Sequence, residues 1–206
     1  MNQLSKEKRL NLFRKILIFW TLFIGLGAIA GGIGMEVDPS GKVLGMDQML
    51  PYFKVLPFAS SLFQDLVFPG IALIIVNGIS NLTASVFLFL KKKTGYILGL
   101  IFGITLMMWI CIQFVILPVN FLSTIYFFFG LFQAITGVAC LIFLKQTKFV
   151  FNKEDYKNIK EDSKTIVLYF SRMGYVRKKA YEIADSLSSS IEEIFTPENT
   201  SNTLGF

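Results

Sequence analysis

The chain of 206 residues contains no histidine and only two cysteines. Without histidine it lacks the usual axial ligand of haem b and the commonest protein ligand of transition metals. Cys111 and Cys140 both lie in long apolar stretches, so we expect packing residues there and neither a disulfide framework nor a metal site. No paired carboxylates and no nucleophile–base combination stand out, so the sequence indicates no catalytic residues.

Charged residues are also missing from the middle of four long apolar runs. These runs cover about residues 16–35, 67–90, 95–117 and 124–144. Each reaches the roughly 20 residues that a helix needs to cross the hydrocarbon of a bilayer, and only a helix satisfies the backbone of such a run in lipid. The sequence therefore predicts a mostly α-helical membrane protein, with a bundle of four transmembrane helices in residues 1–148. The lack of ionisable groups disfavours ion- or proton-coupled transport.

The net charge is +6, and most of the Lys and Arg residues flank the apolar runs on one side of the predicted membrane. The basic residues of that side are Lys6, Lys8, Arg9, Arg14, Lys15, Lys91, Lys92, Lys93, Lys145, Lys148 and Lys153. Because cytoplasmic flanks are rich in Lys and Arg, this pattern predicts a multi-pass plasma-membrane protein with both termini in the cytoplasm, and it disfavours nucleic acid as a partner. An alternative is a cleaved secretory signal ending at Ala28-Ile29-Ala30, which would leave three spans.

The segment between the first two runs has patterns of its own. Residues 35–44 include Asp38-Pro39-Ser40-Gly41, which predicts a small hairpin with a type I turn. Apolar residues then recur at helical spacing through Phe58, Leu62, Phe63 and Leu66. We expect a short amphipathic helix that lies on the outer membrane surface or caps the bundle.

Four amides lie inside the predicted spans: Asn77, Asn81, Gln113 and Gln133. One interpretation is a polar pocket for a quinone, a lipid headgroup or a small solute. The other is that these amides join neighbouring helices, since amides in lipid form hydrogen bonds between helices. The sequence leaves both open.

Glycines recur at small-x-x-x-small spacing on two of the spans. Gly95, Gly99 and Gly103 share one face of the third span, and Gly27 and Gly31 share a face of the first. This spacing lets helix backbones approach closely. It is compatible with packing inside the bundle and equally with a homo-oligomer.

The composition changes after the fourth span. A charged linker at residues 149–163 precedes the apolar run 164–170, which is rich in β-forming residues. A loop at 171–175, helical spacing over 176–190 and alternation over 191–196 follow. A strand, a glycine-containing loop, a helix and a second strand predict a parallel βαβ unit.

The stretch VLYFSRMGYVRKKAYEI within this tail resembles the opening signature of the flavodoxin family. The matching residues are Val167, Leu168, Tyr169, Ser171, Gly174, Ala180 and Ile183. The resemblance implies a flavodoxin-like βαβ portion at about residues 164–206, fused to the four-helix membrane domain. It also implies FMN as cofactor, with the phosphate held by the loop Ser171, Arg172, Met173, Gly174, Tyr175 and Val176 at the start of a helix.

The loop departs from the family pattern. Met173 and Val176 stand where the family has hydroxyl residues, and Tyr175 stands where Asn is common, so Ser171 carries the only loop hydroxyl. Arg172, Arg177 and Lys178 could contribute positive charge instead, or could be ordinary solvated residues of a helix. Similar SRMGY loops occur in flavodoxin-like proteins of anaerobic bacteria.

The resemblance covers only two strands and one helix of a five-stranded fold. We therefore expect a truncated chain, a fragmentary gene product or a natural remnant, with an incomplete FMN site. The first hypothesis for function is a membrane-anchored flavodoxin-like protein that transfers electrons through FMN in its full-length form, to redox partners in the cytoplasm. The alternative is a small multi-pass membrane protein with a binding or accessory role and a vestigial flavodoxin tail.

Overall fold

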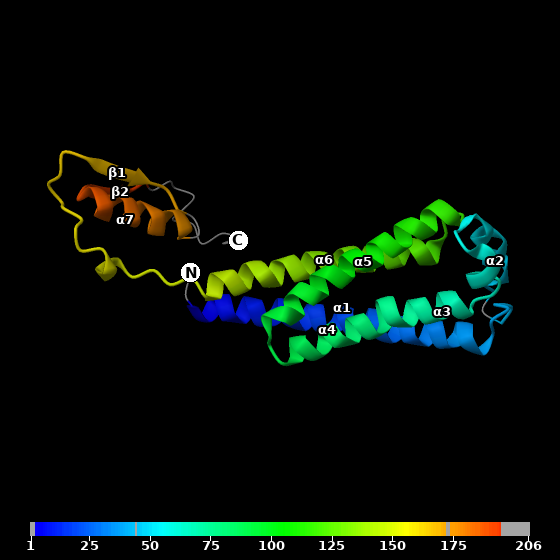
Figure 1. Ribbon diagram of the computed structural model, residues 1–206. Coiled ribbons are helices and arrows are strands. Elements are labelled where there is room, and N and C mark those ends of the chain that lie inside the picture. Colours follow the sequence, from blue (N-terminus) through cyan, green and yellow to red (C-terminus); the bar gives the residue numbers. More distant parts are fainter. Residues whose placement is uncertain (1–2, 44, 172–173, 195–206) are drawn as a thin grey trace. The chain divides into compact units, whose positions relative to one another are not determined.

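The computed structural model describes residues 3–43, 45–171 and 174–194. The described residues divide into two compact units, 3–147 and 148–194. The first is a helix bundle and the second is a small α/β unit, as the sequence predicts (Figure 1).

Four helices of the bundle are long and apolar enough to cross a membrane. They are α1 (Gln3–Val37), the continuous helix Val67–Phe89, α5 (Lys93–Ile116) and α6 (Phe121–Thr147). Their places agree with the four predicted runs. The first starts well before residue 16, because its basic first turns are also helical.

The second long helix is not uniform. It consists of α3 (Val67–Leu73), a π-helical segment η2 (Ile74–Ile79) and α4 (Ser80–Phe89). A π-helix widens the turn by one residue and is often found at functional sites. Hydropathy does not reveal this irregularity, because the segment is apolar on both sides of Asn77.

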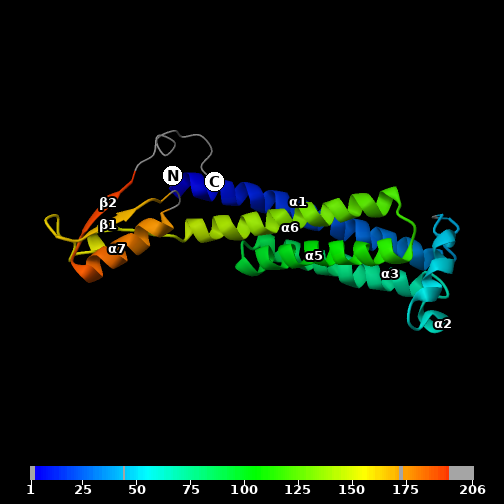
Figure 2. The same cartoon turned by 90° about the horizontal axis from the view of Figure 1, so that it is seen from above.

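Glycines bring α5 and α6 into backbone contact. A Cβ atom at Gly103 would lie 2.7 Å from the Ala134 nitrogen and 2.9 Å from the Gly130 oxygen, and one at Gly137 would lie 2.8 Å from the Leu100 Cα. The two helices run side by side in both views (Figures 1 and 2). Gly95, Gly99 and Gly103 are all buried against other helices of the same chain. This packing covers the predicted glycine face of α5 from within the chain.

The glycines of α1 are placed differently from the expectation. A Cβ at Gly27 or Gly31 would meet only ordinary contacts, at 3.4 Å from the Tyr126 hydroxyl and 3.5 Å from Leu73. The close approach to the second long helix is made instead at Gly32, whose Cβ would lie 2.8 Å from the Gly70 oxygen. Gly27 and Gly31 thus lie at ordinary packing distances from other helices, and their role in close packing or in a homo-oligomer stays a prediction.

The segment between α1 and α3, residues 38–66, is called the outer segment here. It begins with the predicted turn, in which the Gly41 N–H donates to the Asp38 carbonyl at 2.9 Å. Val43 N–H and the Ser40 hydroxyl donate to the Asp38 carboxylate at 2.7 and 2.6 Å, and these bonds hold the pKa of that carboxyl below its usual value. The predicted hairpin is wrong, since none of the described residues 35–43 forms a strand.

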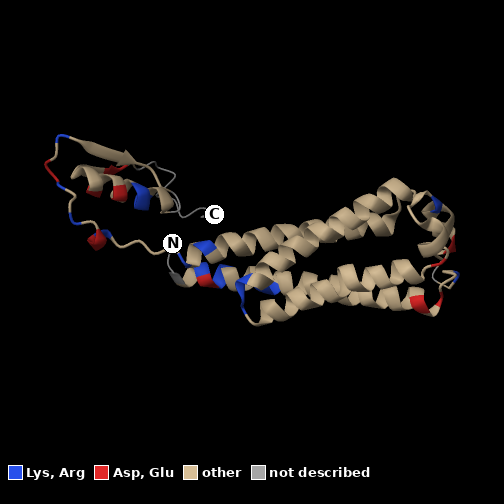
Figure 3. Cartoon of the chain, viewed as in Figure 1, with Lys and Arg blue, Asp and Glu red and all other residues tan. Residues whose placement is uncertain are grey.

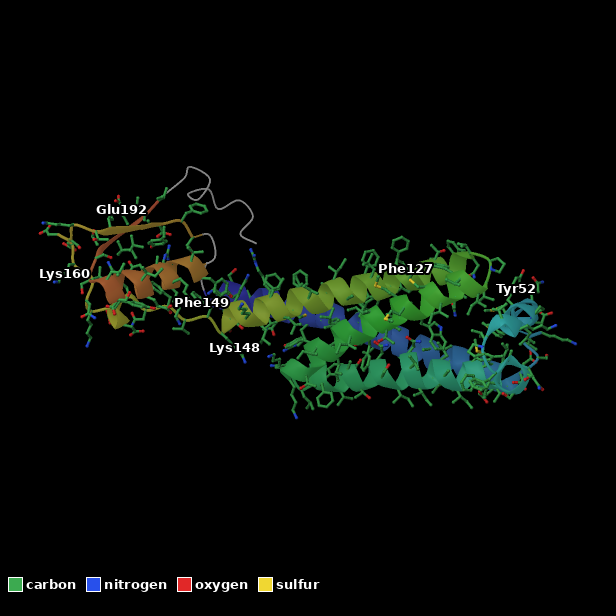
Figure 4. All side chains as sticks on the ribbon, turned by 45° about the horizontal axis from the view of Figure 1, so that its top comes forward. Tyr52, Phe127, Lys148, Phe149, Lys160 and Glu192 are labelled. Atoms are coloured by element: carbon green, nitrogen blue, oxygen red, sulfur yellow. The ribbon has the colours of Figure 1, made fainter. Side chains whose placement is uncertain are left out.

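Two short helices form the remainder of the outer segment. The first is η1 (Asp47–Val55), a 3₁₀-helix that the sequence did not predict, and the second is α2 (Ala59–Leu62). The expected amphipathic helix over residues 58–66 is thus reduced to four residues. Figure 4 shows Tyr52 on η1, at the end of the bundle where the outer segment lies.

The second unit contains the predicted βαβ arrangement. Strand β1 (Ile166–Tyr169) pairs in parallel with β2 (Ser190–Glu193), and α7 (Tyr175–Leu187) connects them. Residues that the sequence assigns to the linker join its core: Phe151 and Tyr156 pack against Tyr181, with ring centroids 5.0 and 5.5 Å apart. The end of the predicted second strand, residues 195 and 196, lies outside the described residues.

Candidate functional site

The bundle has a cavity of about 510 Å³ beneath the outer segment. Its wall includes residues of α1, the second long helix, α5, α6 and residues 45–52. Most of the lining is apolar or aromatic, with Trp109, Tyr126 and Tyr52 as the large rings. The residues with side-chain polar groups other than these are Asn77, Gln113, Asn120, Ser123 and Gln48. None of the described lining residues is charged.

A hydrogen-bond network next to this cavity ties the helices together. The Gln133 amide nitrogen of α6 donates to the Asn81 side-chain oxygen of α4 and to the Gly99 carbonyl of α5, each at 2.8 Å. Ser85 donates to Thr21 of α1 at 2.8 Å, and Thr21 donates to the Leu17 carbonyl at 3.0 Å. Gln133 and Asn81 are therefore interhelical links, as one interpretation of the sequence proposed.

Asn77 does not join this network through its side chain. Its backbone carbonyl accepts from the Asn81 amide at 2.9 Å, but neither amide atom of the Asn77 side chain bonds to a described residue. The residue is 1% exposed and lines the cavity. An unpaired buried amide costs stability, and most such groups in proteins have partners. Oxygens of Glu36, Gln133 and Gln146 are also buried without a bond to a described residue, but Asn77 lines the cavity and has both side-chain atoms unpaired.

Gln113, the remaining amide, lies at the opposite wall. Its side-chain oxygen accepts from the Ser123 hydroxyl at 3.0 Å, which joins the end of α5 to the start of α6. The Ser123 N–H in turn bonds to the Asn120 side chain at 2.8 Å. The four predicted amides thus separate into three that bond to other side chains and one that faces the cavity without a partner.

The predicted FMN loop lies in the second unit and is only partly described, because Arg172 and Met173 fall outside the described residues. Ser171 is buried and accepts the Gly174 N–H at 3.0 Å. Gly174 has a left-handed φ of +88°, and a Cβ there would lie 3.1 Å from the Phe149 ring. The Tyr175 ring packs edge-on against Phe149, with centroids 4.5 Å apart, and Val176 is exposed.

The end of this loop where α7 begins has the form that a phosphate group would require. Gly174 precedes α7 without a side-chain cap, and the start of a helix is a place where backbone amides can bind an anion. Ser171 accepts a bond but its hydroxyl can still donate. These described residues fit the phosphate end of a flavin nucleotide.

The contacts of Arg177 do not indicate a role in phosphate binding. Its guanidinium binds both carboxylate oxygens of Glu193 on β2, at 2.7 and 2.8 Å, and the Tyr169 hydroxyl donates to the same carboxylate at 3.0 Å. Burial and the Glu193 carboxylate raise the pKa of Tyr169 to about 12, and the hydrogen bond to Glu193 raises the pKa of Arg177. The charge of Arg177 is thus paired with Glu193 within the small unit.

The described ranges contain no group of three acidic or cysteine side chains that could hold a metal ion. Comparison with protein-family models, with curated proteins and with solved structures finds no match to this chain. The class defined by the fold is a four-helix apolar bundle joined to a small parallel βαβ unit. The likeness to flavodoxins remains a prediction from the sequence.

The different bonding of Asn77 and Gln133 leads to a testable prediction about stability. Gln133→Leu removes two hydrogen bonds and leaves the Asn81 oxygen unpaired, so we expect it to destabilise the bundle by roughly 1–3 kcal/mol. Asn77→Leu removes no side-chain bond and buries an apolar group, so we expect the midpoint temperature of unfolding to be unchanged or higher. Thermal unfolding of the purified chain in detergent measures both. A loss for Asn77→Leu as large as that for Gln133→Leu would show that Asn77 is bonded after all.

Proposed function

We propose that this chain is a multi-pass membrane protein whose helix bundle binds a small uncharged amphiphile in the cavity beneath the outer segment. The observation that carries the proposal is the unpaired Asn77 amide in a largely apolar cavity. Ligand sites are commonly clefts of roughly 300–1,000 Å³ with apolar walls and a few placed polar groups. The cavity matches that description in size and in lining.

The outer surface of the bundle supports a position in lipid. Large apolar side chains that point away from the bundle recur along every long helix, for example Phe19, Ile75, Met108 and Ile135, each about half exposed. At most 39% of the residues in the most apolar stretch of any of the four helices are buried. Soluble monomers rarely expose continuous apolar surface on this scale, whereas lipid would cover it.

The distribution of charge supports an orientation for the bundle. Lys and Arg gather at the end that holds the start of α1, the turn between α4 and α5 and the end of α6 (Figure 3). The other end holds Glu36, Asp38, Asp47 and Asp65 with only two lysines. By the positive-inside rule, the basic end of the bundle faces the cytoplasm when the protein lies in the plasma membrane. The cavity then lies toward the outer side.

This orientation predicts the accessibility of two positions to a membrane-impermeant maleimide. We expect Ser40→Cys, in the outer segment, to be labelled on intact cells. Lys92→Cys, in the turn between α4 and α5, should be labelled only after the cells are permeabilised. The unsubstituted chain gives the background, because Cys111 and Cys140 lie within apolar helices. The reverse pattern of labelling would overturn the orientation.

Ligand binding can be measured through Trp109, which lines the cavity. The chain has two tryptophans, so Trp20→Phe leaves Trp109 as the single reporter. In phosphatidylcholine nanodiscs, a bromine-terminated long-chain alcohol should quench Trp109 fluorescence and reach saturation, because the bromine is carried into a site of limited capacity.

Gly27→Leu provides the control for this measurement. Gly27 lines the cavity, and the room around it lets a larger side chain occupy the space of the ligand. Saturable quenching should disappear in this variant and persist in Val138→Leu, which changes an exposed position of α6. Quenching that rises linearly and equally in all three chains would reflect partition into lipid and would reject the proposal.

A second candidate function is FMN-linked electron transfer in a longer form of the protein. It is favoured by the parallel βαβ unit and by the left-handed Gly174 at the uncapped start of α7. Ser171, Gly174 and the first amides of α7 would hold the FMN phosphate, while the bound flavin would supply the redox chemistry. The cytoplasmic side proposed for both termini would give such a unit access to soluble redox partners.

FMN titration tests this second function. We expect the chain to quench FMN fluorescence weakly, and we expect Gly174→Val to abolish the effect, because a branched side chain is strained at φ +88° and would collide with Phe149. Leu187→Met is the matched control, since it changes an exposed position at the far end of α7, away from the loop. Equal quenching by all three chains, or none by the parent chain, would count against a flavin site in this loop.

A further inference from the structure

The two unpaired atoms of Asn77 restrict the chemistry of the ligand. The side-chain amide has an NH₂ group that donates and an oxygen that accepts, and both are buried without a bond to a described residue. A ligand group that only accepts would satisfy the nitrogen and leave the oxygen unpaired. A group that both donates and accepts would satisfy the two together.

Charge restricts the ligand further. The lining residues include no Lys, Arg, Asp or Glu, and the chain has no histidine. A carboxylate, phosphate or ammonium in this cavity would be buried without a counter-ion, which is far more costly than burying a neutral polar group. The apolar walls and rings around Asn77 instead suit a hydrocarbon or aromatic body.

None of the described neighbouring side chains forms a hydrogen bond with the side-chain amide of Asn77. Asn81, four residues away, uses its nitrogen on the Asn77 carbonyl and its oxygen on Gln133. Gln133 also has an oxygen without a bond to a described residue, but it does not line the cavity. Of the two amides with unpaired atoms in this part of the bundle, Asn77 is thus the one that lines the cavity.

We infer that the cavity is selective for a neutral amphiphile whose polar end carries both a donor and an acceptor, a hydroxyl or primary amide, which pairs with Asn77. Quinones, ethers, ketones and fatty-acid anions offer acceptors alone and fit this position less well. The inference rests on the proposed ligand-binding function and adds to it the chemical class of the ligand. A site built to hydrogen-bond a hydroxyl discriminates against an analogue that lacks it, because the buried protein group is then left unpaired.

The test compares the bromine-terminated alcohol with its methyl ether, which keeps the acceptor and loses the donor. Both are titrated into the Trp20→Phe chain in phosphatidylcholine nanodiscs, with concentrations expressed as mole fraction in the bilayer. We expect the alcohol to bind about 3–10-fold more tightly than the ether, the range expected for one neutral hydrogen bond. In Asn77→Leu both probes lose their bonds to the amide, so the ratio of alcohol affinity to ether affinity should fall to about one.

The outcomes separate the inference from the proposed function. If the alcohol and the ether both saturate with equal affinity, and Gly27→Leu abolishes both, the cavity binds amphiphiles but the inferred pairing with Asn77 is wrong. If neither probe saturates, the proposed function fails together with the inference. The alcohol-to-ether ratio is measured on a chain with an intact cavity, so it decides the question even if Asn77→Leu does not fold.

Discussion

The hydrogen bonds of one amide, Gln133, hold the bundle in its arrangement. A single nitrogen at the centre of α6 donates both to a side chain of α4 and to a backbone carbonyl of α5. Such a bond between helices is possible only where their backbones lie close. Contacts at Gly103 and Gly137 provide that closeness between α5 and α6, and contacts at Gly95 provide it between α5 and α4. In an interior without water a misplaced Gln133 would leave several polar groups unpaired, so the register of three helices depends on it.

The same requirement makes Asn77 unusual. It lies in the π-helical segment of the second long helix, where the wider turn departs from the regular pattern of bonds. The bundle supplies partners for Asn81 and Gln113 and for one end of Gln133, yet it leaves both atoms of the Asn77 side chain toward the cavity. Local irregularity, an unpaired polar group and a cavity coincide at one place. Since irregular and incompletely satisfied positions cluster at functional sites, this coincidence directs attention to the bundle and not only to the tail.

The sequence predicted the parts of this structure that depend on composition and period. Long uncharged runs identified the four helices. The apolar, β-forming run 164–170, the helical spacing over 176–190 and the alternation over 191–196 identified the βαβ unit. The outer segment was harder, because short 3₁₀-helices such as η1 depend on local turns and on what lies beneath them. Spacing placed Asn77 and Asn81 on one face, but it could not show which amide is paired, since the partner Gln133 lies 52 residues beyond Asn81. Likewise, Gly27 and Gly31 have the packing motif, whereas Gly32 makes the close contact.

The pairing of Arg177 with Glu193 bears on how the two candidate functions compare. The ion pair joins the start of α7 to β2, and the Tyr169 hydroxyl completes the carboxylate's surroundings from β1. The charge of Arg177 is therefore used within the small unit, where it joins two of its elements. The loop keeps a left-handed glycine at the start of a helix, a place where backbone amides can bind an anion. The cavity in the bundle, by contrast, is lined by a buried amide that bonds to no described residue. On physical grounds the stronger demand for a ligand comes from the bundle.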